Sequence, residues 1–492
     1  MALGMHIHFI AVAGTGMGAL AGLFRSLGHD VSGSDVAFDP PMGPALERWG
    51  VRLMQGFDPA HLDPRPDLVV VGNVCRKDNP EARAAIDGGL HVTTMAHALA
   101  DHALVETSPL VVAGTHGKTT TSALSAYLLD AVGLAPGFLI GGLPKNFETS
   151  FRAAAPHRKK LPLTSGAPLS PRRPPFVVEG DEYDTAFFEK TPKFWHYRPE
   201  VVILTSIEHD HVDIYPSEEA YLEAFRELVR RVPETGLIVA AAFDPKVVEV
   251  VRSCARAEVA WYALQGDETF GIAPEWLGAP GVVDFGLQEL DLYVGGVACP
   301  RARLGLPGEH NVRNAIAAIA AAAQGYGARI DELLNALPGF QGVRRRQDLL
   351  GEPSGVRVYD DFAHHPTAVE ETLRALRAKH PEGKLIAVFE PRSATACRKL
   401  HQEAYAHAFG PADRVLFPPL GRTNIPQEER LDLDRLVSEL NQAGKRAEAL
   451  ASIDAIVERI AEEAASGDTV ALLSNGAFGG IHQKLLEALR RR

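Results

Sequence analysis

The segment between Leu110 and Leu129 carries the residue types best suited to phosphate chemistry in this chain of 492 residues. It reads LVVAGTHGKTTTSALSAYLL, which is a short β-branched run, a glycine turn and an apolar helical pattern. In such a layout, backbone N–H groups hold a polyphosphate at a helix N-terminus, the lysine neutralises β/γ-phosphate charge and a threonine hydroxyl binds Mg²⁺. The sequence therefore predicts a nucleotide site formed by Gly114, Thr115, His116, Gly117, Lys118, Thr119 and Thr120.

The spacing of this loop leaves a second interpretation open. The general phosphate-loop pattern has a glycine five residues before its second glycine, and Val112 occupies that position. The alternative is an ordinary glycine turn with Lys118 on the surface. We favour the phosphate loop because glycine, lysine and three threonines coincide with the required strand and helix.

Two groups of acids and histidines follow predicted strands downstream of this loop. The strand 176–178 ends in EGDEYDTAFFEK, and the strand 201–204 ends in TSIEHDHVDIY. Crowded carboxylates are costly unless cations neutralise them, so we expect Mg²⁺ there, with an exposed acidic turn as the alternative. Together the groups indicate a two-cation site for phosphoryl transfer. Their members are Glu179, Asp181, Glu182 and Asp184 in the first group and Glu208, His209, Asp210, His211 and Asp213 in the second.

A glycine-rich turn near the N-terminus predicts a second nucleotide-binding unit. The strand His6 to Val12 leads into an amphipathic helix, and Gly14, Gly16 and Ala19 fit the pattern G-x-G-x-x-G/A. Asp35 ends the next strand, where an acid would contact a ribose, and the polar loop GNVCRKDNPE follows a third strand. On this pattern alone, a nicotinamide-dependent Rossmann dehydrogenase is an alternative.

Polar side chains in the second half of the chain could bind a base and an anion. The segment LPGEHNVRNAIAAIAAAA predicts a helix whose Asn311 and Asn314 share one face, where amides can pair with adenine. Capping of the helix by Asn311 is the alternative. Four later strands end at one sheet edge, and their loops carry His364, Arg392 and Arg422, which suit carboxylates of a small substrate. These strands are Val356 to Tyr359, Lys384 to Phe389, Arg414 to Phe417 and Thr469 to Leu473.

Length and composition bound the domain organisation and the setting. The length predicts about three α/β domains, with boundaries near residue 106 and near residue 337, where PGFQGVRRRQDL predicts a connector. A net charge of −12 argues against nucleic-acid binding, and so against a P-loop motor or nucleic-acid ATPase. No apolar run approaches the ~20 residues of a membrane span, and four dispersed cysteines indicate reduced thiols in a cytoplasmic protein. The segment His157 to Pro175 predicts a flexible surface insertion, as a solvated loop or one near the substrates.

Taken in order, GTHGKTTT, EGDEYD, IEHDHVD, GEHNVRN, RRR and YDDFAHHP resemble the Mur ligase family of ATP-dependent amide ligases, which act on UDP-N-acetylmuramoyl precursors of peptidoglycan. The resemblance spans the whole chain and implies ATP and Mg²⁺ as cofactors. It implies an N-terminal Rossmann-like domain (1–106) for the UDP-sugar and a central P-loop ATPase with a parallel-rich sheet (107–337). A C-terminal Rossmann-like α/β domain (338–492) would bind the incoming amine and close on ATP.

The resemblance also assigns residues to each part of the reaction. A carboxylate of the sugar would attack the γ-phosphate beside Lys118, and an amine would then attack the acyl phosphate. His209, His211 and His364 are candidates for accepting the amine's proton. The implied metal ligands are Thr119, Glu179 and His211, and further nucleotide contacts are Asn311, Asn314, Arg346 and Asp361. The implied UDP-sugar residues are Gly14, Thr15, Gly16, Met17, Asp35 and Asn73, and the peptide residues are Phe362, His364, Arg392 and Arg422.

Within the family, EGDEYDTAFFEK, EPRSAT and SNGAFGGIHQKLL resemble the members that join UDP-N-acetylmuramate to the recycled tripeptide L-alanyl-γ-D-glutamyl-meso-diaminopimelate. The L-alanine-adding members are the rival, with serine where Tyr183 stands and His-Arg where Arg392 and Ser393 stand. The lysine that many members carbamylate is missing, because 217–232 contains no lysine. We expect small-molecule substrates, no nucleic-acid or membrane partner, and a monomer or weak homo-oligomer.

Overall fold

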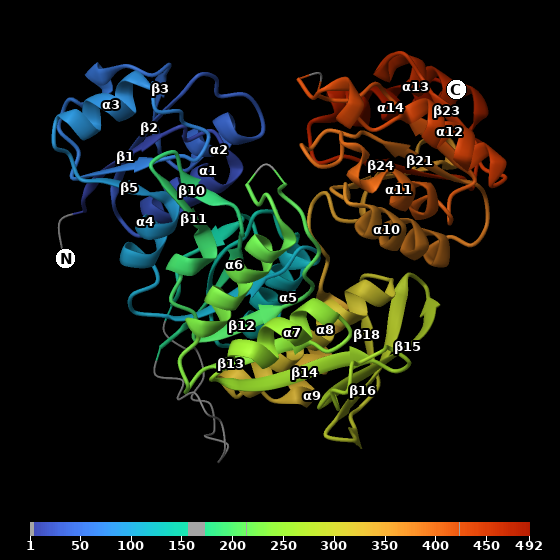
Figure 1. The fold of residues 1–492 in the computed structure, drawn as a ribbon, viewed down its shortest axis with the longest axis horizontal. Helices are drawn as coiled ribbons and strands as arrows, with labels where there is room; N and C mark the ends of the chain where they lie inside the picture. The colour runs from blue at the N-terminus through green and yellow to red at the C-terminus, as the bar shows by residue number, and fades with distance from the viewer. Residues whose placement is uncertain (1–3, 156–172, 213, 423) are drawn as a thin grey trace.

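The computed structural model describes residues 4–155, 173–212, 214–422 and 424–492. Figure 1 shows three α/β units in chain order, with the central unit between the N-terminal (blue) and C-terminal (orange to red) units. Residues 157–172 of the predicted insertion lie outside the described residues, and so does Asp213. Among the described helices, none combines the length and apolar character needed to cross a membrane.

The N-terminal domain is a five-stranded parallel sheet in the order β3-β2-β1-β4-β5. Because β1 lies between β2 and β4, the strand order reverses beside β1, which leaves a crevice at its carboxyl end. The first strand ends at Ile10 and not at the predicted Val12, because Ala11 has a left-handed backbone with φ +68°. The strands are β1 (His6–Ile10), β2 (Asp30–Asp35), β3 (Arg52–Gln55), β4 (Leu68–Val71) and β5 (Val92–Thr94), and the helices are α1 (Thr15–Ser26), α2 (Met42–Arg48), α3 (Pro80–Asp87) and α4 (Met95–His102).

The central domain is built on an eleven-stranded sheet with a parallel middle. Its central strands β9, β6, β12, β13 and β14 are largely buried, and their carboxyl ends share one edge. The strands are β6 (Ser108–Ala113), β7 (Gly137–Leu139), β8 (Phe151–Arg152), β9 (Pro175–Gly180), β12 (Val201–Leu204), β13 (Leu237–Ala241), β14 (Glu258–Leu264), β15 (Trp276–Asp284), β16 (Leu287–Val294), β17 (Val297–Ala298) and β18 (Ala302–Leu304). The helices are α5 (Lys118–Ala131), α6 (Glu218–Arg230), α7 (Pro245–Cys254), α8 (Glu309–Ala320) and α9 (Ile330–Ala336), and a separate ribbon is formed by β10 (Asp184–Ala186) and β11 (Glu189–Pro192).

Two features of the central domain differ from the sequence prediction. The strand before the acidic motif continues to Gly180 and does not end at Val178, so Glu179 lies inside β9. This extension follows from pairing, because β9 aligns with β6 as far as Ala113. The region 254–300, in which the sequence indicates only short strand-like pieces, contains the long antiparallel hairpin β15–β16.

The C-terminal domain is a six-stranded sheet in the order β19-β20-β24-β21-β22-β23, parallel except for β19. The predicted connector at 338–349 is packed rather than free, because Val343 is fully buried and pairs with Pro144, and Asp348 begins β19. The strands are β19 (Asp348–Gly351), β20 (Arg357–Asp361), β21 (Leu385–Phe389), β22 (Arg414–Phe417), β23 (Arg446–Ala449) and β24 (Thr469–Leu473). The helices are α10 (Pro366–Lys379), α11 (Gln402–Ala408), α12 (Leu433–Gln442), α13 (Ile453–Glu463) and α14 (Ile481–Arg490).

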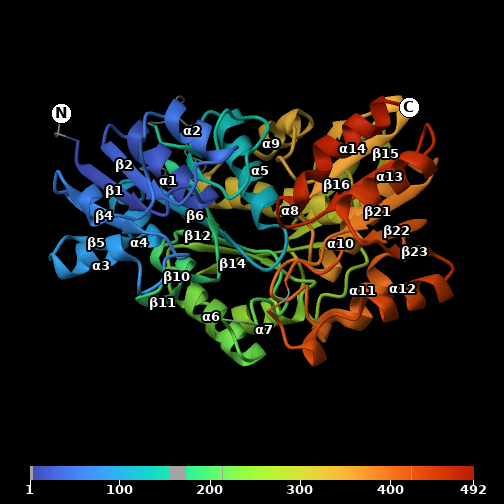
Figure 2. The same ribbon diagram turned by 90° about the horizontal axis from the view of Figure 1, so that it is seen from above.

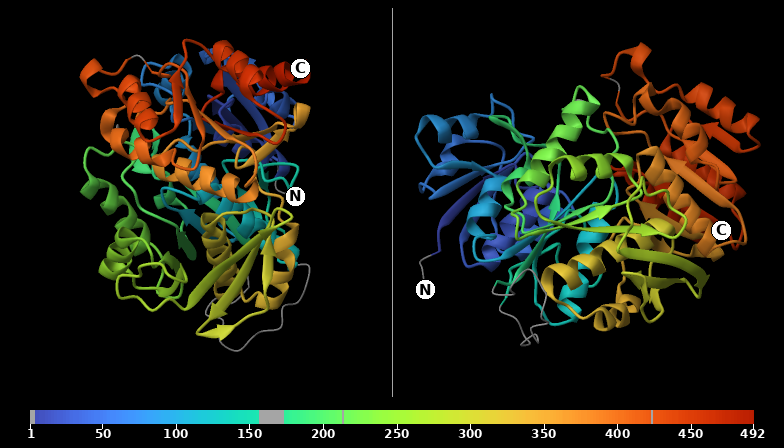
Figure 3. Two further views of the ribbon diagram at one scale, coloured as in Figure 1. Left: turned by 90° about the vertical axis from the view of Figure 1, so that its right-hand side faces the viewer. Right: turned by 60° about the horizontal axis from the view of Figure 1, so that its bottom comes forward.

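Hydrophobic packing joins the first two domains and separates the third. One cluster of buried side chains includes residues of β1 and α1 as well as β6, β12 and α8. Phe151 of β8 packs edge to face on Trp49 across this junction, with ring centroids 4.8 Å apart. The C-terminal domain has its own clusters on the two faces of its sheet. Figures 2 and 3 show it against the central domain, with α10 next to α8.

Candidate active site

The loop between β6 and α5 has the backbone of a phosphate loop. Gly117 is the N-cap of α5 and has φ +79°. Gly114 has φ +133°, and a Cβ there would lie 2.2 Å from the Thr205 hydroxyl oxygen, so glycine is required. The Thr115 amide donates to the Ser206 carbonyl at 2.9 Å, which fixes the loop on the carboxyl end of β12. The loop therefore presents the N-terminus of α5 to the shared sheet edge.

Lys118 begins α5, and oxygen atoms surround its ammonium group. Its Nζ donates to the Gly114 carbonyl at 2.5 Å and lies 3.0 Å from Glu182 Oε2. Burial alone would lower the pKa of Lys118, but Glu182, Asp181 and Glu179 raise it above its usual value. Lys118 therefore remains charged at the position where phosphate groups would lie.

Glu182 is the buried counter-ion of this lysine. Burial would raise its pKa, but Lys118 and His211 lower it to about 2. His211 Nε2 lies 3.5 Å from Glu182 Oε1, and although burial lowers the pKa of His211, this carboxylate raises it overall. Among the other acids of the motif, Asp181 pairs with Lys193 at 3.3 Å. Cations of the protein itself therefore neutralise part of the acidic group for which the sequence suggests Mg²⁺.

Two of the three predicted metal ligands are in contact. The Thr119 hydroxyl donates to Glu179 Oε1 at 2.6 Å, and the Gly141 amide donates to Glu179 Oε2 at 2.7 Å. Burial, reinforced by a neighbouring carboxylate, raises the pKa of Glu179. His211, the third predicted ligand, faces Glu182 instead. A hydroxyl and a buried carboxylate beside a phosphate loop are hard oxygen ligands, and they fit a Mg²⁺ ion that is bound together with phosphate oxygens.

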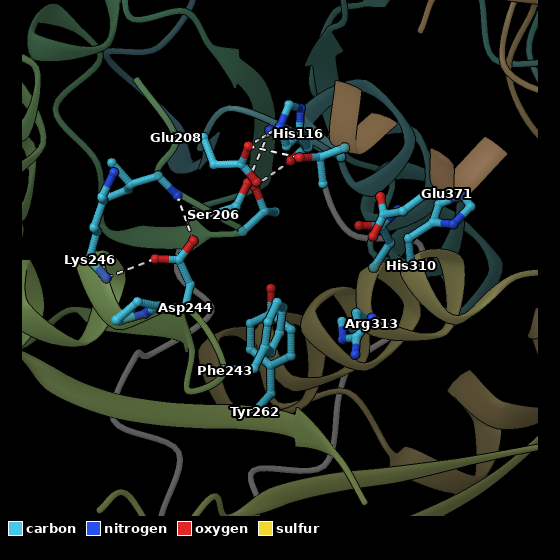
Figure 4. Close-up of a pocket in the computed structure, with 16 residues that line it drawn as sticks. His116, Ser206, Glu208, Phe243, Asp244, Lys246, Tyr262, His310, Arg313 and Glu371 are labelled. Carbon is cyan, nitrogen blue, oxygen red and sulfur yellow. Dashed lines mark hydrogen bonds and ion pairs between the residues drawn. The ribbon is translucent and has the colours of Figure 1, made fainter. Parts of the chain in front are cut away.

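A cavity of about 410 Å³ opens beside the loop (Figure 4). The rings of Phe243 and Tyr262 form one wall, edge to face, with centroids 5.8 Å apart. The Arg313 guanidinium lies 4.7 Å from the centroid of Phe243 and is held by Asp267 at 2.6 Å. Asn314 of α8 also lines the cavity. Aromatic walls with a few fixed polar groups suit a nucleotide base.

Asn311 and Asn314 share one face of α8, as their spacing predicts. Asn314 faces the phosphate loop, since a Cβ added to Gly117 would lie 2.6 Å from Asn314 Oδ1. Asn311 donates to the Pro307 carbonyl at 2.9 Å. Gly308 is the N-cap of α8, so the alternative in which Asn311 caps this helix is wrong.

Side chains of the C-terminal domain reach the phosphate loop. Arg346 donates to the Thr119 hydroxyl at 3.3 Å, and its guanidinium lies 5.1 Å from the ring centroid of Phe362. Asp361 accepts from the Gln347 amide at 2.7 Å, and burial raises its pKa. A small cavity of about 60 Å³ next to the loop is lined by the predicted nucleotide residues His116, Gly117, Thr120, Asn311, Asn314, Arg346 and Asp361.

A second cavity, of about 420 Å³, lies between the central and C-terminal domains. Asp210 and His211 border it from the central domain, and the predicted peptide residues His364, Arg392 and Arg422 border it from the C-terminal domain. The structure thus brings together groups from four separate segments. Phe362, the fourth predicted peptide residue, instead packs its ring against Arg345 and Arg346.

The remaining predicted residues lie elsewhere. His209, in the described part of the chain, is not among the lining residues of either cavity, and its Nε2 donates to the Tyr215 carbonyl at 3.1 Å. At the carboxyl edge of the N-terminal sheet, Asp35 accepts from the Ala13 amide at 2.8 Å. The six predicted UDP-sugar residues lie at this edge: Gly14, Thr15, Gly16, Met17, Asp35 and Asn73.

Sequence reasoning missed a group that joins the central and C-terminal domains. Glu208 Oε2 lies 3.4 Å from His116 Nε2 and 3.3 Å from His365 Nδ1, and it accepts from the Thr367 hydroxyl at 2.9 Å. Burial would raise the pKa of Glu208, but these partners, His116 first, lower it to about 2. His116, Glu208 and His365 lie within three separate motifs, and what the sequence did not show is that the fold places these motifs together. Phe243 was missed as well, although it follows β13 at the same sheet edge as the loop.

Comparisons with known proteins agree with this geometry. Three domain families match consecutive parts of the chain: Mur ligase family, catalytic domain (residues 6–107), Mur ligase middle domain (112–322) and Mur ligase, glutamate ligase domain (345–476). The chain is 37% identical over 489 residues to the UDP-N-acetylmuramate–L-alanyl-γ-D-glutamyl-meso-2,6-diaminoheptandioate ligase of Escherichia coli, covering 99% of both chains. It is 33% identical to the UDP-N-acetylmuramate–L-alanine ligase of Roseiflexus sp., covering 99% of this chain and 100% of that one.

The fold comparison gives the same family. The crystal structure of a murein peptide ligase from Psychrobacter arcticus superposes with a TM-score of 0.71 at 34% identity, covering 99% of both chains. The chain therefore belongs to the Mur ligase family. As a member of this family it is an ATP-dependent ligase.

Proposed function

We propose that this enzyme uses ATP to join UDP-N-acetylmuramate to the tripeptide L-alanyl-γ-D-glutamyl-meso-diaminopimelate, with release of ADP and phosphate, in the recycling of peptidoglycan. The observation that carries the proposal is the second cavity, where two guanidinium groups and two imidazoles border a space between the central and C-terminal domains. The guanidinium groups can bind the carboxylates of an anionic peptide, and an imidazole can accept the proton of an attacking amine. The likeness to the E. coli ligase supports the choice of peptide.

The division of labour follows the geometry of the three domains. We assign residues 1–106 to binding of the UDP-sugar, 107–337 to ATP and 338–492 to the peptide. In the first step, the sugar carboxylate attacks the γ-phosphate, and Lys118 stabilises the charge of the transferring group. Thr119 and Glu179 would hold Mg²⁺, which when bound neutralises phosphate charge. The product of this step is an acyl phosphate and ADP.

In the second step, the peptide amine attacks the acyl phosphate and phosphate leaves, so one residue must accept the proton of the amine. His364 fits this role best. Burial lowers its pKa, and its Nδ1 donates to the Phe362 carbonyl at 3.0 Å, which leaves Nε2 as a neutral acceptor. His211 is a weaker candidate because Glu182 raises its pKa and occupies its Nε2, and His209 Nε2 donates to the Tyr215 carbonyl.

Water would hydrolyse an acyl phosphate, so the reacting groups need a closed site. Polar contacts hold the C-terminal domain on the central domain: Arg346 on Thr119, and Thr395 on Asp210 at 2.7 Å. Phe340 and Val343 of the connecting segment pack in the cluster of the first two domains, and beyond them the buried clusters of the C-terminal domain are its own. We infer that the domain opens to admit substrates and closes through these contacts. A cytoplasmic monomer or weak homo-oligomer suits such a cycle.

A phosphate-release assay tests the proposed substrate. The enzyme is supplied with MgATP and UDP-N-acetylmuramate, and then with either the tripeptide or L-alanine. We expect phosphate release with the tripeptide, its loss in Lys118→Met and its retention in Lys190→Met, a matched control in which an exposed lysine of the neighbouring ribbon is removed. Release with L-alanine alone would instead make the enzyme an L-alanine ligase.

A further inference from the structure

Two histidines and a glutamate meet at the junction of the N-terminal and central domains. His97 belongs to α4, Glu189 begins β11, and His196 ends the short 3₁₀ helix η2 (Lys193–His196). Figures 1 and 2 show the ribbon β10–β11 lying next to α4. Within the part of the chain that the structure describes, these three residues are not among the lining residues of the nucleotide cavity or of the second cavity. The ligase reaction as derived above makes no use of them.

The ligand atoms of this group have the spacing of a tetrahedral metal site. His97 Nε2 lies 3.1 Å and His196 Nε2 lies 3.6 Å from Glu189 Oε1, and all three atoms lie within 4.8 Å of one another. A tetrahedral Zn²⁺ ion with bonds of 2.0–2.1 Å requires ligand atoms roughly 3.3 Å apart. The two observed distances lie on either side of that value, and the third distance, between the two histidine nitrogens, is within 4.8 Å.

A hydroxyl oxygen lies where a fourth ligand is needed. The Thr191 hydroxyl lies 2.8 Å from His196 Nε2 and 3.2 Å from Glu189 Oε1. The side chains of His97, Glu189 and His196 are 38%, 25% and 14% exposed, so solvent reaches the group while the surrounding protein holds it. Two imidazole nitrogens with one carboxylate favour Zn²⁺ and similar transition metals over Mg²⁺, which prefers oxygen ligands alone.

We propose that His97, Glu189 and His196 form a binding site for a divalent transition metal ion, best suited to Zn²⁺, with the Thr191 hydroxyl or a water molecule in the fourth position. Such an ion links α4 of the N-terminal domain to a ribbon and turn of the central domain. The ribbon begins at Asp184, two residues after Glu182, so the link also fixes the segment that follows the acidic motif of the active site. The proposal does not depend on which peptide the ligase uses.

Metal titration of the full-length protein tests the site. After treatment with a chelator, the protein is titrated with Zn²⁺ by calorimetry and with Co²⁺ by visible absorption, in excess Mg²⁺ to occupy oxygen-only sites. We expect a tight equivalent with the intense absorption of tetrahedral Co²⁺. Binding should weaken at least tenfold in His97→Ala and Glu189→Gln, and should be unchanged in His91→Ala, a control that removes an exposed histidine of the same domain.

Two results would overturn the proposal. One is wild-type Zn²⁺ affinity in both His97→Ala and Glu189→Gln, and the other is absence of a tight equivalent in the wild-type protein. Thermal unfolding of the metal-free variants shows whether they fold. If His97→Ala does not fold, Glu189→Gln still tests the site, because it keeps the shape of the side chain. Hydrogen exchange then tests the link between domains, because Zn²⁺ should slow exchange in both 95–102 and 184–196. Slowing in only one of these segments would refute the link.

Discussion

Replacement of Glu182 by glutamine tests the electrostatic account of the phosphate loop. The substitution keeps the size of the side chain and removes the charge that Lys118 and His211 share. The pKa of Glu182 falls from 4.5 to about 2 in the folded protein, which corresponds to about 3 kcal/mol at 1.36 kcal/mol per unit. Loss of one partner of a buried ion pair costs about 3–5 kcal/mol, and the lower end applies here because Asp181 and Glu179 also act on Lys118.

The expected loss is large enough for a thermal unfolding experiment. For a domain of 150–250 residues, about 3 kcal/mol lowers the unfolding midpoint by roughly 6–12 °C. Calorimetry of Glu182→Gln at pH 7.5 without nucleotide should show this shift in the transition of the central domain. Asp184→Asn is the matched control, because Asp184 pairs with the exposed Lys190 and such pairs contribute less than about 1 kcal/mol.

The pH dependence gives an independent check of the same reasoning. Because the folded-state pKa of Glu182 is depressed, its stabilisation is present above pH 4.5 and is lost as the pH falls towards 2. The difference in unfolding midpoint between the wild type and Glu182→Gln should therefore shrink on acidification below pH 4.5. Equal midpoints at pH 7.5, or a difference that grows on acidification, would refute the assignment of Glu182 as the counter-ion of Lys118.

Three further predictions concern the cavities and the domain contact. Asn314→Ala should raise the KM for ATP roughly tenfold with little change in the KM for the peptide, because it removes a buried hydrogen-bonding amide. Equal changes in both KM values would contradict the place of Asn314 in the nucleotide cavity. His364→Gln should lower kcat, and the acid limb of the wild-type rate profile should lie below pH 6.5, since burial lowers the pKa of this histidine; a limb above 6.5 would exclude it. Thr395→Val removes the hydrogen bond to Asp210, so X-ray scattering should give a larger radius of gyration for the ligand-free variant than for the wild type. An unchanged radius would contradict the idea that this hydrogen bond holds the two domains together.

Much of the fold could be predicted from local patterns. The strands 201–204, 237–241, 414–417 and 469–473 are buried and pair in parallel with their neighbours, and largely apolar runs of this length indicate such strands directly. Predicted strand ends were wrong where a left-handed backbone ends the strand early, as at Ala11. They were also wrong where pairing with a neighbouring strand extends the strand, as at Glu179. The hairpin β15–β16 was not recognised because Gly278, Pro280 and Gly281 interrupt the alternation of β15.

The parts of the candidate site that lie within single motifs could be predicted from the sequence. The phosphate loop, Asn314 and the three cavity residues His364, Arg392 and Arg422 follow from residue type and position after a strand or at a helix start. Pairings between motifs did not follow, since spacing along the chain does not report which strand ends meet. Glu208 with His365 is one such pairing, formed across a domain boundary. His211 faces Glu182 for the same reason: the fold, and not the motif, selects its partner.

A competition experiment tests the proposed function most directly. The enzyme is incubated with MgATP, UDP-N-acetylmuramate and equal concentrations of the tripeptide and L-alanine, and the UDP-linked products are identified by mass spectrometry. The structure and family likeness lead us to expect the UDP-N-acetylmuramoyl tripeptide as the dominant product, formed with one ADP per amide bond. A product that carries L-alanine alone, or consumption of ATP without an amide product, would contradict this account.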